Sequence, residues 1–164
     1  MSEKIKITFP DGNARSVDKG TTGLSIAESI AKSLAREAIA IEVNNKLCDL
    51  SYPLDNDTTI NIIKRNDDQA LELIRHDCAH VMAESVQELF PGTQVTIGPT
   101  IENGFYYDFA RDVPFTTEDL GIIEAKMNET INKEQSFKRE VWQRSEAIDY
   151  FTKKGESYKV EIIQ

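Results

Sequence analysis

A short polar run near the middle of the chain most constrains what this sequence can fold into. Residues 64–68, Lys-Arg-Asn-Asp-Asp, contain no apolar side chain. Domain boundaries fall in exposed polar segments of this kind, so we expect a separate hydrophobic core on each side. The predicted domains cover residues 1–64 and 71–164, with a linker at residues 65–70.

The first domain begins with the pattern of a hairpin followed by a helix. Polar and apolar residues alternate in 4–9 and again in 14–17, with turn residues between them, which is typical of a β-hairpin. A helix is predicted to begin at Thr21-Thr22. Its apolar stripe has spacings of three and four, and consists of Leu24, Ala27, Ile30, Ala31 and Leu34.

Three further strands are predicted after this helix, at residues 39–43, 47–50 and 58–63. The order of elements is therefore strand, strand, helix, strand, strand, strand. One helix laid across one face of a mixed sheet buries both apolar surfaces. We therefore predict a β-grasp, ubiquitin-like domain, and an α+β fold class for the whole chain.

The second domain is predicted to combine two long helices with short strands. Apolar residues from Leu71 to Leu89 trace a helix that ends at Phe90-Pro91-Gly92, and a second helix begins at Thr116-Thr117. The stripe of the second helix contains Leu120, Ile123, Met127 and Ile131. The other expected elements are strands at 95–97, Ile101, 105–109 and 137–142, a short helix from Ser145 to Gly155, and a final strand at 157–163.

Charge and hydropathy exclude several classes of protein. There are 28 acidic and 19 basic residues, a net charge of -9, which argues against binding of nucleic acid by general phosphate attraction. No apolar run is long enough for a membrane helix, and the first residues do not resemble a signal peptide. We therefore expect a cytoplasmic protein without membrane contact. Cys48 and Cys78 are far apart in sequence and are expected to be thiols.

The chain has only two histidines, His76 and His80, four residues apart on the first long helix. This spacing places both imidazoles on one helix face. Measured from the stripe through Leu71, Cys78 and Leu89, they lie at about 140° and 180° and are predicted to point away from the core. A functional pair and an exposed polar helix face are both compatible with this pattern.

Two neighbouring imidazoles can bind a metal, orient a water or transfer a proton near neutral pH. A zinc site needs another protein ligand, and no third histidine exists. Cys78 projects with the apolar stripe, and Glu84 alone is weak support, so we predict no metal site. Neither a nucleophilic serine elbow nor a glycine-rich phosphate loop is present, so ATP chemistry is not expected in this chain.

Five blocks of sequence resemble, in order and spacing, the amino-terminal part of bacterial threonyl-tRNA synthetases. They are Arg75-His76-Asp77-Cys78-Ala79-His80, Phe90-Pro91, Ile97-Gly98-Pro99, Asn103-Gly104-Phe105-Tyr106-Tyr107-Asp108 and Gly155-Glu156-Ser157-Tyr158-Lys159-Val160. The first 64 residues are similar to the TGS domain that this family shares with certain GTPases and stringent-response enzymes. The resemblance covers essentially the whole chain and agrees with the β-grasp prediction.

The resemblance implies that the second domain is an editing domain, of the type found in threonyl- and alanyl-tRNA synthetases, which hydrolyses seryl-tRNA(Thr). It implies that His76 and His80 position a water, that Lys159 holds this water or stabilises negative charge, and that Tyr107 lines the pocket. Without the resemblance, a solvated strand lysine and a sheet-packing tyrosine are the more usual interpretations of the last two residues.

Members of this family are longer and continue into a class II synthetase core and an anticodon-binding domain. The resemblance implies that ATP, magnesium and zinc belong to that core, and that this region itself needs no cofactor. It also implies further editing residues in a later Cys-x-x-x-His segment. We therefore expect the second domain to be incomplete at its carboxy-terminal end and impaired in hydrolysis, and the full-length enzyme to be a homodimer.

The expected partner is tRNA(Thr), although the acidic composition provides little general attraction for its phosphates. Basic residues can gather into a local rim or remain scattered, and the sequence favours neither arrangement. They are Lys64, Arg65, Arg75, Lys126, Lys133, Lys138, Arg139, Arg144, Lys153 and Lys154. Two other hypotheses stay open: a non-catalytic β-grasp module that binds RNA or protein, and a metal hydrolase.

Overall fold

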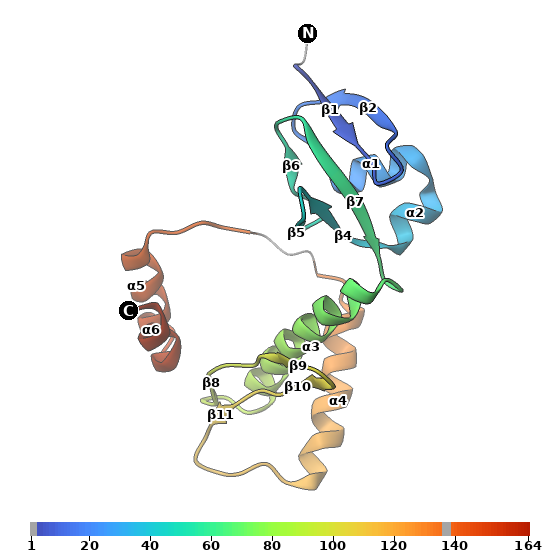
Figure 1. Cartoon of the computed structure of the whole chain (residues 1–164). Helices are drawn as coiled ribbons and strands as arrows, with labels where there is room; N and C mark the ends of the chain where they lie inside the picture. Colours follow the sequence, from blue (N-terminus) through green and yellow to red (C-terminus); the bar gives the residue numbers. More distant parts are fainter. Residues whose placement is uncertain (1–2, 136–138) are drawn as a thin grey trace. The chain divides into compact units, whose positions relative to one another are not determined.

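The chain begins with the predicted hairpin in the computed structural model, which describes residues 3–135 and 139–164 (Figure 1). Strand β1 (Lys4–Thr8) pairs antiparallel with β2 (Ala14–Asp18). Alternation in β1 points Ile5 and Ile7 into the core, where both are buried. Gly12 has a φ of 83° in the connecting turn, a backbone conformation that glycine adopts without strain.

The helix that follows is interrupted, contrary to the prediction. Helix α1 (Gly23–Ile30) begins at Thr22, whose hydroxyl accepts a hydrogen bond from the Ser25 amide. It ends because Ala31 is extended, and α2 (Lys32–Glu37) starts anew. The predicted stripe is also wrong in part: α1 buries Gly23, Ile26 and Ala27, whereas Leu24 and Ile30 are each 39% exposed.

The first unit contains a five-stranded mixed sheet in the order β2-β1-β7-β4-β5. The remaining strands are β4 (Ala38–Val43), β5 (Lys46–Cys48) and β7 (Thr58–Lys64), with a small additional pair formed by β3 (Thr21–Thr22) and β6 (Pro53–Leu54). Strand β7 pairs parallel with β1 and antiparallel with β4.

The core of this unit joins the sheet to α1 and contains Ile5, Ile7, Ile26, Ile41, Leu54 and Ile60. One helix therefore shares its core with a mixed sheet. This confirms the predicted β-grasp architecture.

The chain divides into two compact units, Met1–Leu73 and Ile74–Gln164. Helix α3 (Asp68–Leu89) therefore begins in the first unit and continues in the second. The predicted linker at residues 65–70 is too long by three residues, because 68–70 already form the first turn of α3. Ala70 is fully buried with Ala40 and Ile63 in a small second cluster.

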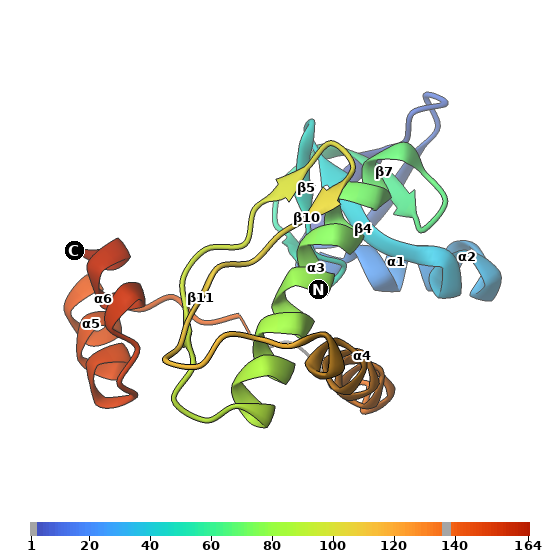
Figure 2. The same ribbon diagram turned by 90° about the horizontal axis from the view of Figure 1, so that it is seen from below.

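In the second unit, α4 (Thr117–Asn132) lies beside α3 (Figures 1 and 2), and the Lys126 ammonium lies 2.7 Å from a Glu88 carboxylate oxygen. Helix α4 begins at Thr116, as predicted; the Thr116 amide donates to the Asp119 carboxylate over 2.8 Å. Its stripe is only partly buried: Ile123 is in the core, but Leu120 and Ile131 are exposed.

Short strands connect α3 to α4. Strand β8 (Gln94–Val95) pairs with β11 (Phe109–Ala110), and β9 (Thr100–Ile101) pairs with β10 (Gly104–Phe105). The strand predicted at 105–109 is therefore two short strands separated by three residues. Arg75 on α3 donates to the Glu102 carbonyl over 2.8 Å, which fixes the β9-β10 turn to the helix.

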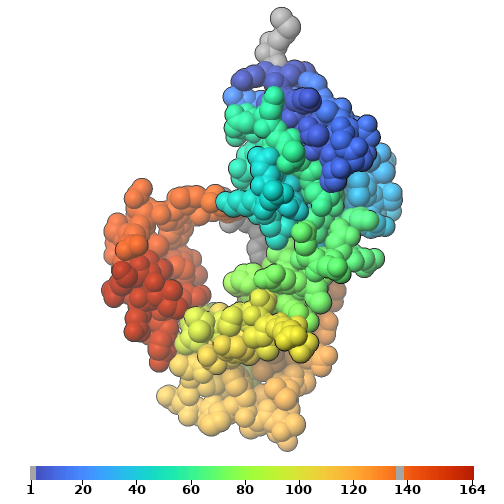
Figure 3. Space-filling model, viewed as in Figure 1, coloured from blue at the N-terminus to red at the C-terminus, as the bar shows by residue number. Residues whose placement is uncertain are grey.

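The carboxy-terminal segment contains two short helices, α5 (Arg144–Lys153) and α6 (Ser157–Ile163). The prediction of a strand at 157–163 is wrong, because these residues form α6. This helix starts shortly after Gly155, whose φ is 75°. The predicted strand at 137–142 lies partly outside the described residues, and 139–142 form no strand. Figure 3 shows the red surface of α6 meeting the yellow-green surface around β8.

Candidate functional site

The histidines lie on α3 beside its buried face. This face runs through Ala79, Ala83 and Val86, which are all buried, whereas His76 and His80 are exposed. At about 100° per residue, His76 lies only about 60° from Ala79. Both side chains are exposed, as predicted, but the predicted stripe is not the buried face of the helix, because Leu71 is itself exposed.

The two imidazoles touch each other. The Nε2 atoms of His76 and His80 are 3.0 Å apart, and the ring centroids are 4.5 Å apart with an interplanar angle of 86°. This contact follows from the helical spacing, since residues four apart stand one above the other. The structure therefore brings the two sequence-predicted histidines together as one polar group.

The surroundings of His80 favour its neutral form. Partial loss of water around the exposed His80 side chain lowers its pKa, and the neighbouring His76 and the positive charge of Lys159 lower this pKa further, while Asp77 opposes them. A neutral imidazole has one nitrogen that accepts a hydrogen bond, which is needed to orient or deprotonate water.

Lys159 comes from a different element, the short helix α6. Its side chain is half-buried, and its ammonium lies 5.3 Å from the centre of the Phe151 ring on α5. The strand that sequence reasoning predicted here is replaced by a helix. The positive charge of Lys159 nevertheless contributes to the lowered pKa of His80, so the two sequence-predicted residues are electrostatically linked.

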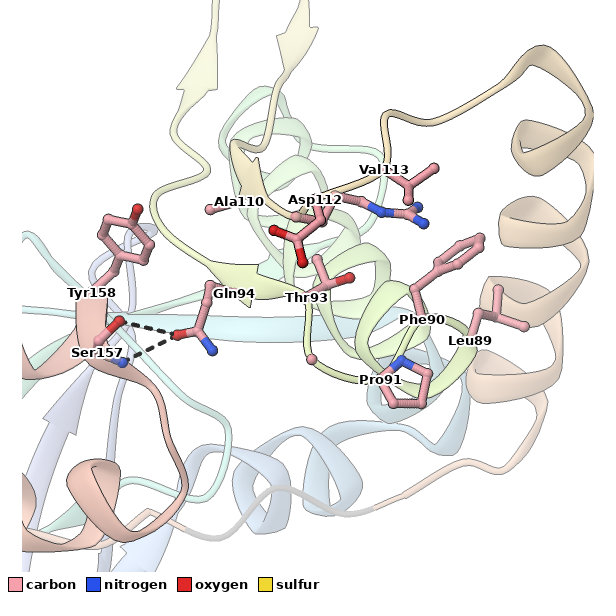
Figure 4. A pocket seen from close by; sticks show the side chains of 12 residues that line it. Leu89, Phe90, Pro91, Thr93, Gln94, Ala110, Asp112, Val113, Ser157 and Tyr158 are labelled. Carbon is pink, nitrogen blue, oxygen red and sulfur yellow. Dashed lines mark hydrogen bonds between the residues drawn. The ribbon is translucent and has the colours of Figure 1, made fainter.

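Three hydrogen bonds fix the start of α6 to the rest of the unit. The Gln87 side-chain amide on α3 donates to the Glu156 carboxylate over 2.6 Å. The Gln94 side-chain oxygen accepts from the Ser157 amide over 3.1 Å and from its hydroxyl over 3.4 Å (Figure 4). Sequence reasoning missed Gln87 and Gln94, because nothing in a local pattern indicates a partner more than sixty residues away.

Tyr107, in the segment between β10 and β11, is half-buried and stacks on Phe109, with ring centroids 5.0 Å apart. Its ring also packs against the backbone of Gly98, where a side chain would collide with it. Burial raises the pKa of Tyr107, and the charge of Glu156 raises it further. The charge of Glu156, the residue before α6, therefore acts on the Tyr107 hydroxyl.

An open cavity of about 780 Å³ lies next to this region. Figure 4 shows its lining, which comes from three segments, 89–94, 110–113 and 157–158. One of the lining residues is Arg111, whose guanidinium lies 4.4 and 4.5 Å from the ring centres of Phe90 and Phe115. The two histidines are not among the residues that line this cavity.

Residues 3–135 and 139–164 contain no cluster of three or more histidine, cysteine, aspartate or glutamate side chains arranged to hold a metal ion. Within the same ranges, no helix combines the length and the apolar character needed to cross a membrane.

Residues 5–64 match the TGS domain family. Over 163 residues, 99% of its length, the chain is 60% identical to a threonine-tRNA ligase of Rhizobium rhizogenes and covers 24% of that protein. It is 59% identical to the threonine-tRNA ligases of Chelativorans sp. and Agrobacterium fabrum over the same share of the chain. The chain thus spans about a quarter of the length of these relatives.

Proposed function

We propose that this chain, a relative of threonine-tRNA ligases that carries a TGS domain, serves in hydrolytic removal of serine wrongly esterified to threonine tRNA. The observation that carries the proposal is the pair of touching imidazoles on α3; the positive charge of Lys159 on α6 supports it through its effect on the pKa of His80. Water-mediated ester cleavage needs a group that orients water and a cation near the developing negative charge.

A ligase for threonine has a physical need for such a step. Serine lacks one methyl group of threonine, and a difference of this size is worth only about 1–3 kcal/mol of discrimination in a binding pocket. A second site that accepts the smaller amino acid and cleaves its ester supplies the missing selectivity.

In the proposed reaction, a water molecule attacks the carbonyl carbon of the seryl ester, and the bond between this carbon and the ribose oxygen breaks. Neutral His80, with His76 beside it, orients the water and accepts its proton. Lys159 stabilises the negative charge on the carbonyl oxygen, and Tyr107 binds the amino acid. The ribose oxygen leaves with a proton, and the step uses no cofactor.

The test uses seryl-tRNA(Thr) labelled in the serine, with an excess of protein so that slow hydrolysis is measurable. The 164-residue chain is compared with a hybrid in which it replaces the matching region of the Rhizobium rhizogenes ligase, to which it is 60% identical. We expect the hybrid to release serine faster than the spontaneous reaction. His76→Ala and His80→Ala should each slow this release by about 10²-fold or more, with threonine charging unchanged.

The matched control is Glu72→Ala, a truncation of an exposed residue on the same helix. It should leave serine release unchanged. Serine release that is as fast in both histidine variants as in the unaltered hybrid would contradict the proposal. Binding of tRNA without any release by the hybrid would instead support the non-catalytic module.

A further inference from the structure

We propose that Gln87 and Glu156 are a positioning pair, whose hydrogen bond fixes the helix that carries Lys159 to the helix that carries His80. The inference rests on the proposed function, in which these two groups work together. The bond joins the side-chain amide of Gln87, on α3, to the carboxylate of Glu156, just before α6. Neither residue is assigned a part in the reaction itself.

The helix that carries Lys159 needs external support. Helix α6 has seven residues, and isolated helices of this length are not stable in water. The residue at its N-cap, Glu156, makes no side-chain capping bond within the helix. Its carboxylate instead accepts a hydrogen bond from the side-chain amide of Gln87 over 2.6 Å. The pair therefore contributes to the location of α6 rather than to its internal stability.

The spacing along both helices links this bond to the candidate site. Lys159 follows Glu156 by three residues, about one helical turn, so the anchor at Glu156 also sets the position of Lys159. On α3, Gln87 follows His80 by seven residues, which is two turns along the same face. The bond thus aligns the α6 turn that carries Lys159 with the α3 face that carries His80.

Burial makes this bond a specific one. Gln87 and Glu156 are both half-buried, and the second carboxylate oxygen of Glu156 is buried without a hydrogen-bond partner among the described residues. A hydrogen bond to a charged group is stronger than a neutral one, and more so away from water. Loss of Gln87 would leave the carboxylate without its described partner and favour its movement into solvent, together with α6.

The experiment follows the imidazole proton signals of the 164-residue chain by NMR during a pH titration, which gives one signal set for each of only two histidines. The groups that face His80 are His76 and Asp77 on α3 and Lys159 on α6. Lys159→Gln should raise the pKa of His80, because a positive charge that lowers it is removed. Gln87→Ala and Glu156→Ala should raise it toward the same value.

The sign of the effect separates positioning from a direct charge effect. Removal of the negative charge of Glu156 would by itself lower the pKa of His80, so a rise in Glu156→Ala must come from displacement of Lys159. Glu156→Gln is the conservative variant: it keeps an oxygen that accepts from Gln87, and it should leave the pKa of His80 at or slightly below the wild-type value.

Amide spectra of β1, α3 and α4 verify that each variant is folded, and a variant that fails this check is replaced by Gln87→Asn. An unchanged titration of His80 in Gln87→Ala and Glu156→Ala would overturn the proposal, as would an unchanged titration in Lys159→Gln. The measurement uses no tRNA. If the variants raise the pKa of His80 but the hybrid releases no serine, only the proposed function is refuted. If the hybrid releases serine but the variants leave the pKa of His80 unchanged, only the positioning pair is refuted.

Discussion

Substitution of Gly98 by alanine tests whether Tyr107 must lie where the structure places it. A Cβ atom at Gly98 would lie 2.8 Å from Cγ of the Tyr107 ring, and closer still to Cδ2 and Cε2. Carbon atoms in ordinary contact are about 3.5–4.0 Å apart, so the ring has to move by about 1.5–2 Å to clear its nearest atom. Tyr107 is stacked on Phe109, which restricts that movement.

The expected cost of Gly98→Ala is about 1–3 kcal/mol of unfolding free energy, the usual range for an added methyl group that does not fit. A displacement of about 1 Å or more at a binding residue also lowers the rate of a positioned reaction by about 10²-fold. We therefore expect both lower stability and slower serine release by the hybrid.

Stability is measured by urea denaturation, followed through the fluorescence of Trp142, the only tryptophan of the chain. The matched control is Gly121→Ala in α4, where no atom lies within 4 Å of the new Cβ. This control should gain up to about 1 kcal/mol from the higher helix propensity of alanine. A Gly98→Ala variant that is as stable as wild type and releases serine at the same rate would contradict this close packing of Tyr107 on Gly98.

Two further predictions concern other parts of the chain. The pKa of His80 is lowered from its ordinary value of 6.5, so as the pH falls below that value the unfolded chain takes up the proton first. As the pH falls from about 6.5 to the lowered pKa of His80, the free energy of unfolding should therefore fall as well. Urea denaturation at a series of pH values should show a smaller fall in His80→Asn. An equal dependence on pH in both proteins would contradict this prediction. Ile7→Ala truncates a side chain that is 0% exposed and should lower the free energy of unfolding by about 2–5 kcal/mol. Amide hydrogen exchange in β1 and β7 measures this loss. Unchanged exchange would show that this core does not unfold cooperatively.

Much of the first unit could be predicted from sequence, because its local and tertiary preferences agree. The alternation in β1 matches the burial of Ile5 and Ile7, and Thr22 caps α1 as its residue type indicates. The interruption at Ala31 had no such indicator, since neither glycine nor proline marks it and alanine favours helix.

The contact between His76 and His80 could be predicted because it depends only on helical spacing. Residues 157–163 were misassigned because the alternation of Tyr158, Val160 and Ile162 is ambiguous in so short a segment. These residues form a helix instead, and hydrogen bonds from distant parts of the chain hold its start at Glu156 and Ser157. The close packing of the Tyr107 ring on Gly98 also depends on tertiary structure, and no sequence pattern indicates it.

The 3.0 Å separation of the two Nε2 atoms couples the tautomers of the histidines. In this bond one nitrogen carries the hydrogen and the other offers a lone pair, so the ring that donates fixes which form its neighbour takes. A neutral ring that accepts at Nε2 must hold its hydrogen at Nδ1, on the opposite edge. A ligand that bonds to the outer edge of one imidazole therefore also selects the hydrogen-bonding character of the other.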